Sequence, residues 1–250
     1  MTFTVASPIL WKVPPLAVVL LDQEIHLWQV SLDQVPPIVS RLFELLSADE
    51  RTHAENIQAE QERDHYIIGR GALRTILARY LGISPEQVQL EYNAHGKPTL
   101  PGNIPLRFNL AHSNDLMVVA VTLQREIGID IEHLHLMPEA QNIANRIFTK
   151  TEIKSLRNLP ESQRLEGFFI HWVCKEAYLK ALGNGFARPL DSFEILSTLR
   201  RPSGLLKVFD DPSESKRWFF QVFRPSDGYV AAIAVEQKDL KKVYWQWLSH

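Results

Sequence analysis

The spacing of apolar residues in the first half of the chain predicts two helices and several short strands. Apolar positions recur at helical spacing from Arg63 onward, and Gly82 supplies the stop signal. A shorter helix with two prolines in its first turn is predicted over 35–46, and a turn or short helix over 84–87. The other apolar runs are short and bounded by turn residues, so we predict strands at 16–21, 25–30, 88–92, 106–110 and 116–122.

The second half repeats this order of elements. The segment from Ile127 to Glu132 has an isoleucine at every second position, which predicts a strand with its isoleucines on one face. Thr149 and Glu152 have the spacing of a capping box at the start of a helix. We predict helices at 139–148, 149–159 and 162–182, the last ended by Gly183, and strands at 193–199, 205–209, 218–224 and 229–235.

Two features indicate that the halves are copies of each other. A long helix ends in Leu-Gly at Gly82 and again, 101 residues later, at Gly183. A strand that follows an aspartate comes later in each half, after Asp115 and, 112 residues on, after Asp227. Loop insertion in the second copy accounts for the difference of eleven residues.

The duplication predicts an α+β fold of two similar, pseudo-twofold-related lobes. We expect an N-terminal lobe at 1–124 and a C-terminal lobe at 125–250, joined near 124–127. The cleft between two such lobes is the natural ligand site. Because the duplicated halves take the place of a subunit pair, we expect a monomer.

Composition narrows the classes of function. The 250 residues and the 45% hydrophobic content are enough for a soluble globular chain. The 27 basic and 29 acidic residues nearly cancel, which argues against a nucleic-acid or membrane-surface binder. The apolar run at 16–21 is too short for a signal peptide or a membrane span. Cys174 is the single cysteine, so no intramolecular disulfide can form, and we expect a cytoplasmic protein.

Asp130 and Glu132 are the first candidates for chemistry. They lie two residues apart on a predicted strand, so both carboxylates project from the face opposite the isoleucines. Two such acids repel each other unless a cation lies between them, and carboxylate oxygens suit Mg²⁺, which also takes substrate phosphates. Taken alone, the pair also fits a strand end whose acids face water.

Glu176 and Lys180 are the second candidates. They lie four residues apart on the predicted helix 162–182 and therefore share a face. One interpretation is a single ion pair on a solvated stripe. The other is that an otherwise apolar helix directs an acid and a base into the cleft.

Five short blocks of sequence, spread over both halves, form an ordered set. They are 96–98 (Gly-Lys-Pro), 109–113 (Asn-Leu-Ala-His-Ser), 128–132 (Gly-Ile-Asp-Ile-Glu), 146–152 (Arg-Ile-Phe-Thr-Lys-Thr-Glu) and 168–180, which includes Trp172 and Lys175-Glu176-Ala177. In order and spacing they resemble the signature of 4′-phosphopantetheinyl transferases of the larger, surfactin-synthetase-activator type, in the Trp/Lys-Glu-Ala branch. The resemblance extends from about Arg63 to Asp191, and the two-lobed fold of that family agrees with the duplication.

The resemblance implies a reaction and a metal. The 4′-phosphopantetheinyl group of coenzyme A would pass to a serine of an apo-carrier protein of the acyl, polyketide or peptidyl type, with release of 3′,5′-ADP. Asp130, Glu132 and Glu176 match the magnesium ligands of the family. Three carboxylates and lysines on their own specify phosphate chemistry but not the acceptor, so a magnesium-dependent phosphodiesterase or pyrophosphatase is the alternative enzyme. A coenzyme A-binding module without turnover is the non-enzymatic alternative.

The resemblance also assigns three residues to the transfer step. Glu152 matches the acid proposed as general base for the serine, although the capping box alone also explains its presence. Lys175 is a second candidate for the base, or a structural partner. Lys180 matches a lysine on the pyrophosphate side.

For coenzyme A itself, the expected contacts combine matches and departures. The expected binding residues are Lys97, His112, Ser113, Arg70 and Arg63. Ala111 stands where relatives often carry a serine, and Glu50 and His53 stand where some relatives place lysines that hold the 3′-phosphate. Arg51, Arg63 and Arg70 are available as replacements.

A basic stripe is the last candidate feature. Lys150, Lys154 and Arg157 fall on one face of the predicted helix 149–159, beside Glu152. The stripe is either a solvated face or a surface on which an acidic carrier protein docks.

Overall fold

The elements of the fold follow the same order twice. The structure is a computed structural model that describes residues 9–183, 188–198 and 201–249. The first series consists of β1 (Glu24–Ser31), α1 (Pro36–Glu44), α2 (Ala48–Asn56), α3 (Glu60–Leu81), the 3₁₀ turn η1 (Pro85–Gln87), β2 (Glu91–Tyr92), β3 (Pro98–Thr99), β4 (Leu106–Ser113) and β5 (Leu116–Leu123). The second consists of β6 (Ile127–His133), α4 (Ala140–Ile147), α5 (Lys150–Arg157), α6 (Glu161–Leu182), η3 (Leu190–Ser192), β7 (Phe193–Thr198), β8 (Arg201–Val208), α7 (Glu214–Arg217), β9 (Trp218–Phe223) and β10 (Tyr229–Glu236).

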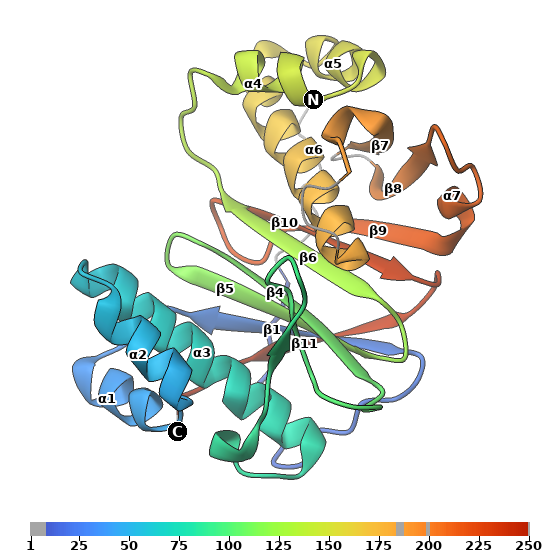
Figure 1. The fold of residues 1–250 in the computed structure, drawn as a ribbon. Coiled ribbons are helices and arrows are strands. Elements are labelled where there is room, and N and C mark those ends of the chain that lie inside the picture. Colours follow the sequence, from blue (N-terminus) through green and yellow to red (C-terminus); the bar gives the residue numbers. More distant parts are fainter. Residues whose placement is uncertain (1–8, 184–187, 199–200, 250) are drawn as a thin grey trace.

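Each series builds an antiparallel sheet with the same strand order. The order is β1-β5-β4 in the first series and β6-β10-β9 in the second. We call the first series, with the final strand described below, the N-lobe, and the second series the C-lobe. Helix α3, with α1 and α2 packed beside it, covers the outer face of one sheet, and α6 covers that of the other, with α4 and α5 at one end of α6 (Figure 1). The expected α+β class with two lobes is confirmed.

The final strand, β11 (Lys241–Gln246), crosses from one lobe to the other. It runs parallel to β1 and pairs with it along the free edge of the N-lobe sheet. The C-terminal end of the chain is thus part of the N-lobe sheet, although the division at 124 assigns it to the C-terminal lobe. An open sheet edge carries unpaired backbone groups, and β11 satisfies those of β1.

The other differences from the predicted elements are local. Residues 16–21 do not form a strand, and the strand expected at 88–92 is reduced to β2. Helix α2 was not predicted, because its nine residues are almost all polar and only Glu50 and Ala54 are buried. Leu199, at the end of one predicted strand, lies outside the described residues.

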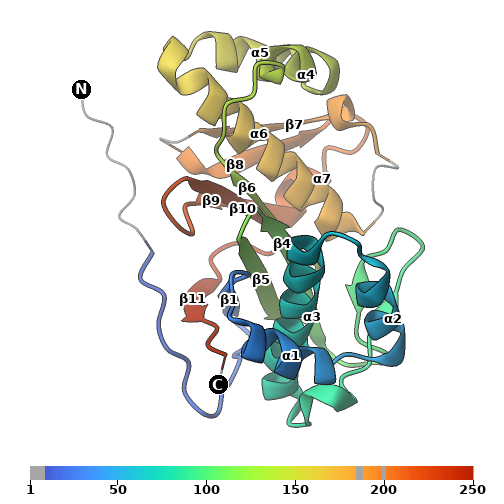
Figure 2. The same cartoon turned by 90° about the vertical axis from the view of Figure 1, so that its left-hand side faces the viewer.

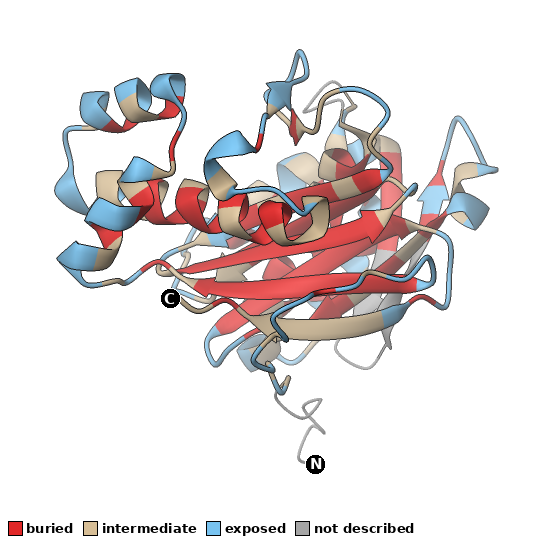
Figure 3. Cartoon of the chain, turned by 90° about the horizontal axis from the view of Figure 1, so that it is seen from below, coloured by how far each residue is buried: buried red, intermediate tan, exposed pale blue. Residues whose placement is uncertain are grey.

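Three apolar cores hold the molecule together. One lies under α3, one lies under α6, and the third fills the space between the two sheets. Ile127, Ile129 and Ile131 all belong to the core between the sheets, as their alternation predicts. Figure 2 shows α1–α3 and α4–α6 at opposite ends of the molecule. Burial follows the strands and the inner faces of the long helices (Figure 3). In the part of the chain that the structure describes, no helix has a stretch long and apolar enough to cross a membrane.

The ends of the strands and the alternation of their side chains fix which residues of the two lobes correspond. Strands β5 and β10 each have eight residues and begin 113 residues apart, one more than the spacing of their aspartates. The side chains agree with this spacing, because Met117 and Val119 of β5 face α3, whereas Val230 and Ala232 of β10 face α6. Trp28 pairs with Val119 as Asp130 pairs with Ala232, and Val30 pairs with Met117 as Glu132 pairs with Val230. Hence Trp28 and Val30 are the N-lobe equivalents of Asp130 and Glu132.

Candidate functional site

Asp130 is buried beneath α6 and does not lie at a solvated strand end. Asp130 is 6% exposed and lies on the face of β6 opposite the isoleucines. The helix comes this close because Gly128 has no side chain: a Cβ there would collide with the carbonyl oxygen of Ala177. The small residue of the predicted strand thus brings α6 directly onto the strand that carries the acids.

Glu176 and Lys180 meet Asp130 from α6. The Lys180 Nζ lies 2.6 Å from the Asp130 Oδ1, whereas the Asp130 Oδ2 and the Glu176 Oε1 are buried with no hydrogen-bond partner among the described residues. Burial raises the pKa of Asp130 to about 6 and that of Glu176 to about 7. Lys180 opposes both shifts, and repulsion from neighbouring carboxylates adds to them.

Glu132 is held at the edge of the same site by the other lobe. Its Oε2 accepts a hydrogen bond of 3.0 Å from the Ser113 Oγ, which in turn accepts one from the backbone N–H of His133. Ser113 therefore orients a carboxylate and connects β4 to β6. This is a different task from the coenzyme A contact expected from the sequence.

The carboxylates have the chemistry of a site for a hard cation. No group of three His, Cys, Asp or Glu side chains in the described ranges is arranged to enclose a metal ion. Nevertheless, two carboxylate oxygens are buried without partners, and repulsion from Glu132 adds to the raised pKa of both Asp130 and Glu176. A divalent cation would relieve both conditions, and oxygen donors suit Mg²⁺. Asp130, Glu132 and Glu176 are the residues that fit it.

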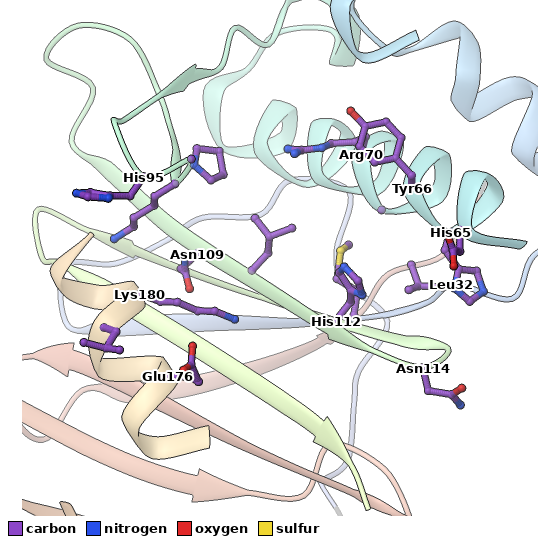
Figure 4. Close-up of a pocket in the computed structure, with 18 of the residues that line it drawn as sticks. Leu32, His65, Tyr66, Arg70, His95, Asn109, His112, Asn114, Glu176 and Lys180 are labelled. Atoms are coloured by element: carbon purple, nitrogen blue, oxygen red, sulfur yellow. The ribbon is translucent and has the colours of Figure 1, made fainter. Parts of the chain in front are cut away.

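A pocket of about 770 Å³ opens beside these acids, between α3, β4, the turn 93–97 and α6 (Figure 4). Lys180 and Glu176 line it from α6. Its ionisable lining is mostly basic and consists of His65, Arg70, His95, Lys97, His112 and Lys180, against Glu62 and Glu176. A cavity with this balance favours an anionic ligand.

Arg70 is the strongest candidate for an anion contact on the α3 side. One nitrogen of its guanidinium, Nη1, is buried without a partner among the described residues. The guanidinium lies 5.5 Å from the ring centre of Tyr66 and 5.6 Å from that of Tyr92. His112 lies across the pocket, where burial and the charges of Lys180, His65 and Arg70 lower its pKa.

Several pocket residues were not expected from the sequence, and two expected binding residues, Arg63 and Ser113, are not among the residues that line it. His65 and Tyr66 line the pocket, and their position about one helical turn before Arg70 was the available signal. Ala111 packs in the core between the sheets, so a hydroxyl there would not face the pocket.

Lys97 lines the pocket but is also held by the C-lobe. Its Nζ lies 3.2 Å from the Ala181 carbonyl oxygen, 3.3 Å from that of Ile127 and 3.4 Å from the Glu126 Oε2. Asn93 donates a hydrogen bond of 2.7 Å to the carbonyl oxygen of Gly183. The turn 93–97 thus satisfies carbonyls at the end of α6, which is the favourable place for a cation on a helix.

Glu50 and His53 line a second groove of about 600 Å³, which shares Tyr66 and Arg70 with the pocket. Glu50 is buried, and its Oε2 lies 2.6 Å from the Arg74 Nε. The His53 ring lies 4.7 Å from that of Tyr66, tilted by 47°. The arginine that lines both cavities, Arg70, is on α3 and not on α2.

Glu152 and Lys175 lie outside the pocket, in the core of the C-lobe. Their side chains are 0% and 1% exposed, and 3.1 Å separates the Lys175 Nζ from the Glu152 Oε2. The Glu152 Oε2 also accepts the backbone N–H of Thr149, which completes the predicted capping box. Its Oε1 accepts the backbone N–H of Ile195. Burial raises the pKa of Glu152, and Lys175 opposes this shift.

Comparison with known proteins supports one family for both lobes. A model of the 4′-phosphopantetheinyl transferase superfamily matches residues 126–234, and a model of the 4′-phosphopantetheinyl transferase N-terminal region matches residues 28–124. The 4′-phosphopantetheinyl transferase HetI of Nostoc sp. is 38% identical over 95% of this chain and 98% of its own length. A 4′-phosphopantetheinyl transferase of Bacillus subtilis is 32% identical over 80% of this chain and 86% of its own. A holo-(acyl-carrier-protein) synthase structure from Bacillus anthracis, in complex with CoA (3′,5′-ADP), covers 44% of this chain and 94% of its own, with 24% identity and a TM-score of 0.36.

Proposed function

Because the chain belongs to the 4′-phosphopantetheinyl transferase family, we propose that it transfers the 4′-phosphopantetheinyl group of coenzyme A to a serine of an apo-carrier protein. The observation that carries this proposal is the junction of a basic pocket with buried, partly unpartnered carboxylates. Such a junction suits a ligand that brings phosphates and a cation together. Coenzyme A has both a pyrophosphate and a separate 3′-phosphate.

The proposed reaction exchanges the phosphoanhydride bond of the pyrophosphate for a phosphate ester bond to serine. The serine oxygen bonds to the phosphorus that carries pantetheine, the bond from that phosphorus to the bridging oxygen breaks, and 3′,5′-ADP leaves as the hydroxyl proton is released. Bound Mg²⁺, held by Asp130, Glu132 and Glu176, would neutralise charge on the phosphate oxygens. The Lys180 Nζ lies 2.6 Å from the Asp130 Oδ1, so its ammonium group would also lie beside the phosphate oxygens of a bound substrate.

For the 3′-phosphate, we assign the contacts to Arg70 and His112, with His65 beside them. The unpartnered nitrogen of Arg70 supports this assignment, as does the clustering of one guanidinium and two imidazoles around one part of the pocket. The ion pair between Glu50 and Arg74 argues against binding of the 3′-phosphate by side chains of α2. Lys97 is assigned to hold α6 and to contribute positive charge at the pocket wall.

A single assay tests the proposal. The protein would be incubated with coenzyme A, Mg²⁺ and a panel of apo-carriers of the fatty-acid, polyketide and peptide-synthetase types, and each carrier weighed by intact mass spectrometry. We expect a gain of one phosphopantetheinyl group, which vanishes when EDTA is added. Free phosphopantetheine with unmodified carriers would instead indicate a phosphodiesterase or pyrophosphatase. Coenzyme A binding without either product would indicate a binding module.

A further inference from the structure

The buried pair in the C-lobe, Glu152 and Lys175, forms more contacts than one ion pair requires. Besides its contact with Glu152, the Lys175 Nζ donates to the carbonyl oxygens of Leu190, at 2.6 Å, and Phe193, at 2.7 Å. It also lies 4.3 Å from the ring centre of Phe193. These contacts join the start of α5, the middle of α6 and the start of β7. We call Glu152 and Lys175 the C-lobe clamp.

The N-lobe contains the same arrangement. Glu50 completes a capping box with Ser47, and its Oε2 lies 2.6 Å from the Arg74 Nε. The Arg74 Nη1 donates to the carbonyl oxygens of Pro85, at 3.3 Å, and Val88, at 2.9 Å. We call Glu50 and Arg74 the N-lobe clamp.

The correspondence between the clamps is exact in position. Arg74 and Lys175 each lie eight residues before the glycine that ends the long helix, Gly82 or Gly183. In each lobe, the two accepted carbonyls belong to the first residue of a 3₁₀ turn and to the residue that follows that turn. A capping-box glutamate bound to a cation on the long helix is therefore a part of the duplicated fold.

The N-lobe clamp exists without any of the candidate metal ligands. Trp28 and Val30 occupy the places of Asp130 and Glu132. Thr75, directly after Arg74, occupies the place of Glu176. A clamp that is built equally well where there are no acids to serve has a structural task.

We infer that the C-lobe clamp positions α6, so that Glu176 and Lys180 face Asp130, and that Glu152 does not accept the proton of the carrier serine. This inference rests on the proposed transfer reaction. Lys175 and Glu176 are neighbours on α6, so their side chains point about 100° apart. With Lys175 fixed in the core, the rotation of the helix is fixed, and Glu176 is directed toward the acids of β6.

The surroundings of Glu152 agree with this assignment. A general base must come within hydrogen-bond reach of the proton that it takes, directly or through one water. Glu152 is 0% exposed, is not among the residues that line either described pocket, and has both carboxylate oxygens bonded within the C-lobe. Its side chain would have to leave three partners before it could meet a substrate.

A double-mutant cycle in the full-length protein tests the inference. The variants are Glu152→Gln, Lys175→Met and the double variant, each assayed for kcat, its pH profile, the Mg²⁺ concentration at half-maximal rate and Tm. The N-lobe pair Glu50→Gln and Arg74→Met provides matched controls for Tm. We expect Glu152→Gln to keep kcat within about tenfold, with the wild-type pH profile, whereas loss of a general base costs about 10²–10⁴-fold.

Lys175→Met should lower Tm and raise the Mg²⁺ requirement, because it buries a carboxylate without its counter-ion and loosens α6. The double variant also removes the unpaired carboxylate, so it should recover part of the lost Tm and part of the raised Mg²⁺ requirement. Loss of a general base by itself would recover neither quantity. The inference is overturned if Glu152→Gln lowers kcat a hundredfold or more while its Tm falls no further than that of Glu50→Gln, or if the double variant recovers nothing. If the wild-type protein leaves every carrier unmodified, the proposed function fails. The structural role of the C-lobe clamp is then tested by Tm alone: it holds if the changes in Tm of Glu152→Gln and Lys175→Met do not add up to that of the double variant.

Discussion

Trp28 in the N-lobe and Asp130 in the C-lobe occupy the same position in two copies of one fold, under the same kind of long helix. A cation on the helix approaches each of them. Arg79 lies 5.8 Å from the ring centre of Trp28, and Lys180 lies 2.6 Å from the carboxylate of Asp130. The N-lobe fills this space with apolar and aromatic groups, whereas the C-lobe fills it with charges.

A second contrast lies two residues away on the strand and one residue away on the helix of the same interface. In the N-lobe, His26 and Tyr80 fill the space between sheet and helix and are hydrogen-bonded to each other at 2.9 Å. Their C-lobe counterparts are Gly128 and Ala181, which let the two backbones touch. The N-lobe therefore forms this interface with no acid at the places of Asp130 and Glu176, and in the C-lobe the close approach of α6 brings Lys180 and Glu176 to the buried Asp130. Buried charges that the scaffold does not need mark a functional site.

The largest effect should come from removing an acid of the C-lobe. Glu176→Gln should lower the rate of carrier modification by about a thousandfold, because it removes a metal ligand that acts on the transferred phosphate. Its Tm should be at least that of the wild type, since a buried, partly unpartnered charge is lost. The equivalent N-lobe change, Thr75→Ala, removes the hydrogen bond from Trp247 and should lower Tm with little effect on rate. Equal rates for the two variants would contradict the contrast between the lobes.

Gly128→Ala should have the next largest effect, on stability. Its new Cβ would meet the backbone of α6, which cannot move without disturbing the site, so we expect a loss of about 3 kcal/mol in the free energy of unfolding. Gly69→Ala on α3 of the N-lobe is the control, because its Cβ would make only ordinary contacts with the side chains of Met117 and Leu32 and should change the free energy of unfolding by less than about 1 kcal/mol. Urea denaturation of both variants measures the difference. If Gly128→Ala lost no more unfolding free energy than the control variant, α6 would not be packed directly on β6.

Much of this contrast was predictable from local sequence, and the rest depends on contacts that are distant along the chain. Isoleucine at every second position fixed the faces of β6, and helical spacing ending in Leu-Gly located α3 and α6. Helix α2 was not predicted because its sequence lacks an apolar stripe. Strand β11 was not predicted because its partner strand is more than 200 residues away along the chain. The N-lobe clamp was hidden for a related reason: Glu50 reads as a surface acid until Arg74 is placed beside it.

Lys180→Gln and Arg79→Gln test whether the cations at equivalent places in the two lobes have different roles. Lys180→Gln should lower kcat about 30-fold, which corresponds to one charge-assisted hydrogen bond of about 2 kcal/mol on the pyrophosphate. Arg79→Gln should change Tm slightly and leave kcat unchanged, since Arg79 contacts Trp28 and lies outside the described pockets. The measurements are steady-state kinetics with saturating coenzyme A and thermal melts. A fall in kcat for both variants would assign Lys180 to the scaffold.

The smallest effect should come from the outer faces of α5 and α2, the helices that begin with the two capping boxes. Lys150, Lys154 and Arg157 are exposed on α5, and no acid of that helix is exposed, whereas Thr52 and Glu55 occupy the places of Lys154 and Arg157 on α2. If the basic face attracts an acidic carrier, Lys154→Glu should raise the KM for carrier about fivefold and leave the KM for coenzyme A unchanged, because one exposed charge contributes about 1 kcal/mol. The effect should shrink at high salt. Thr52→Glu adds one negative charge at the equivalent place in the other lobe, half the change in net charge that Lys154→Glu makes, and should change neither KM. A carrier KM that rises in both variants in proportion to the change in net charge would reduce the effect to net charge and remove α5 as the docking face.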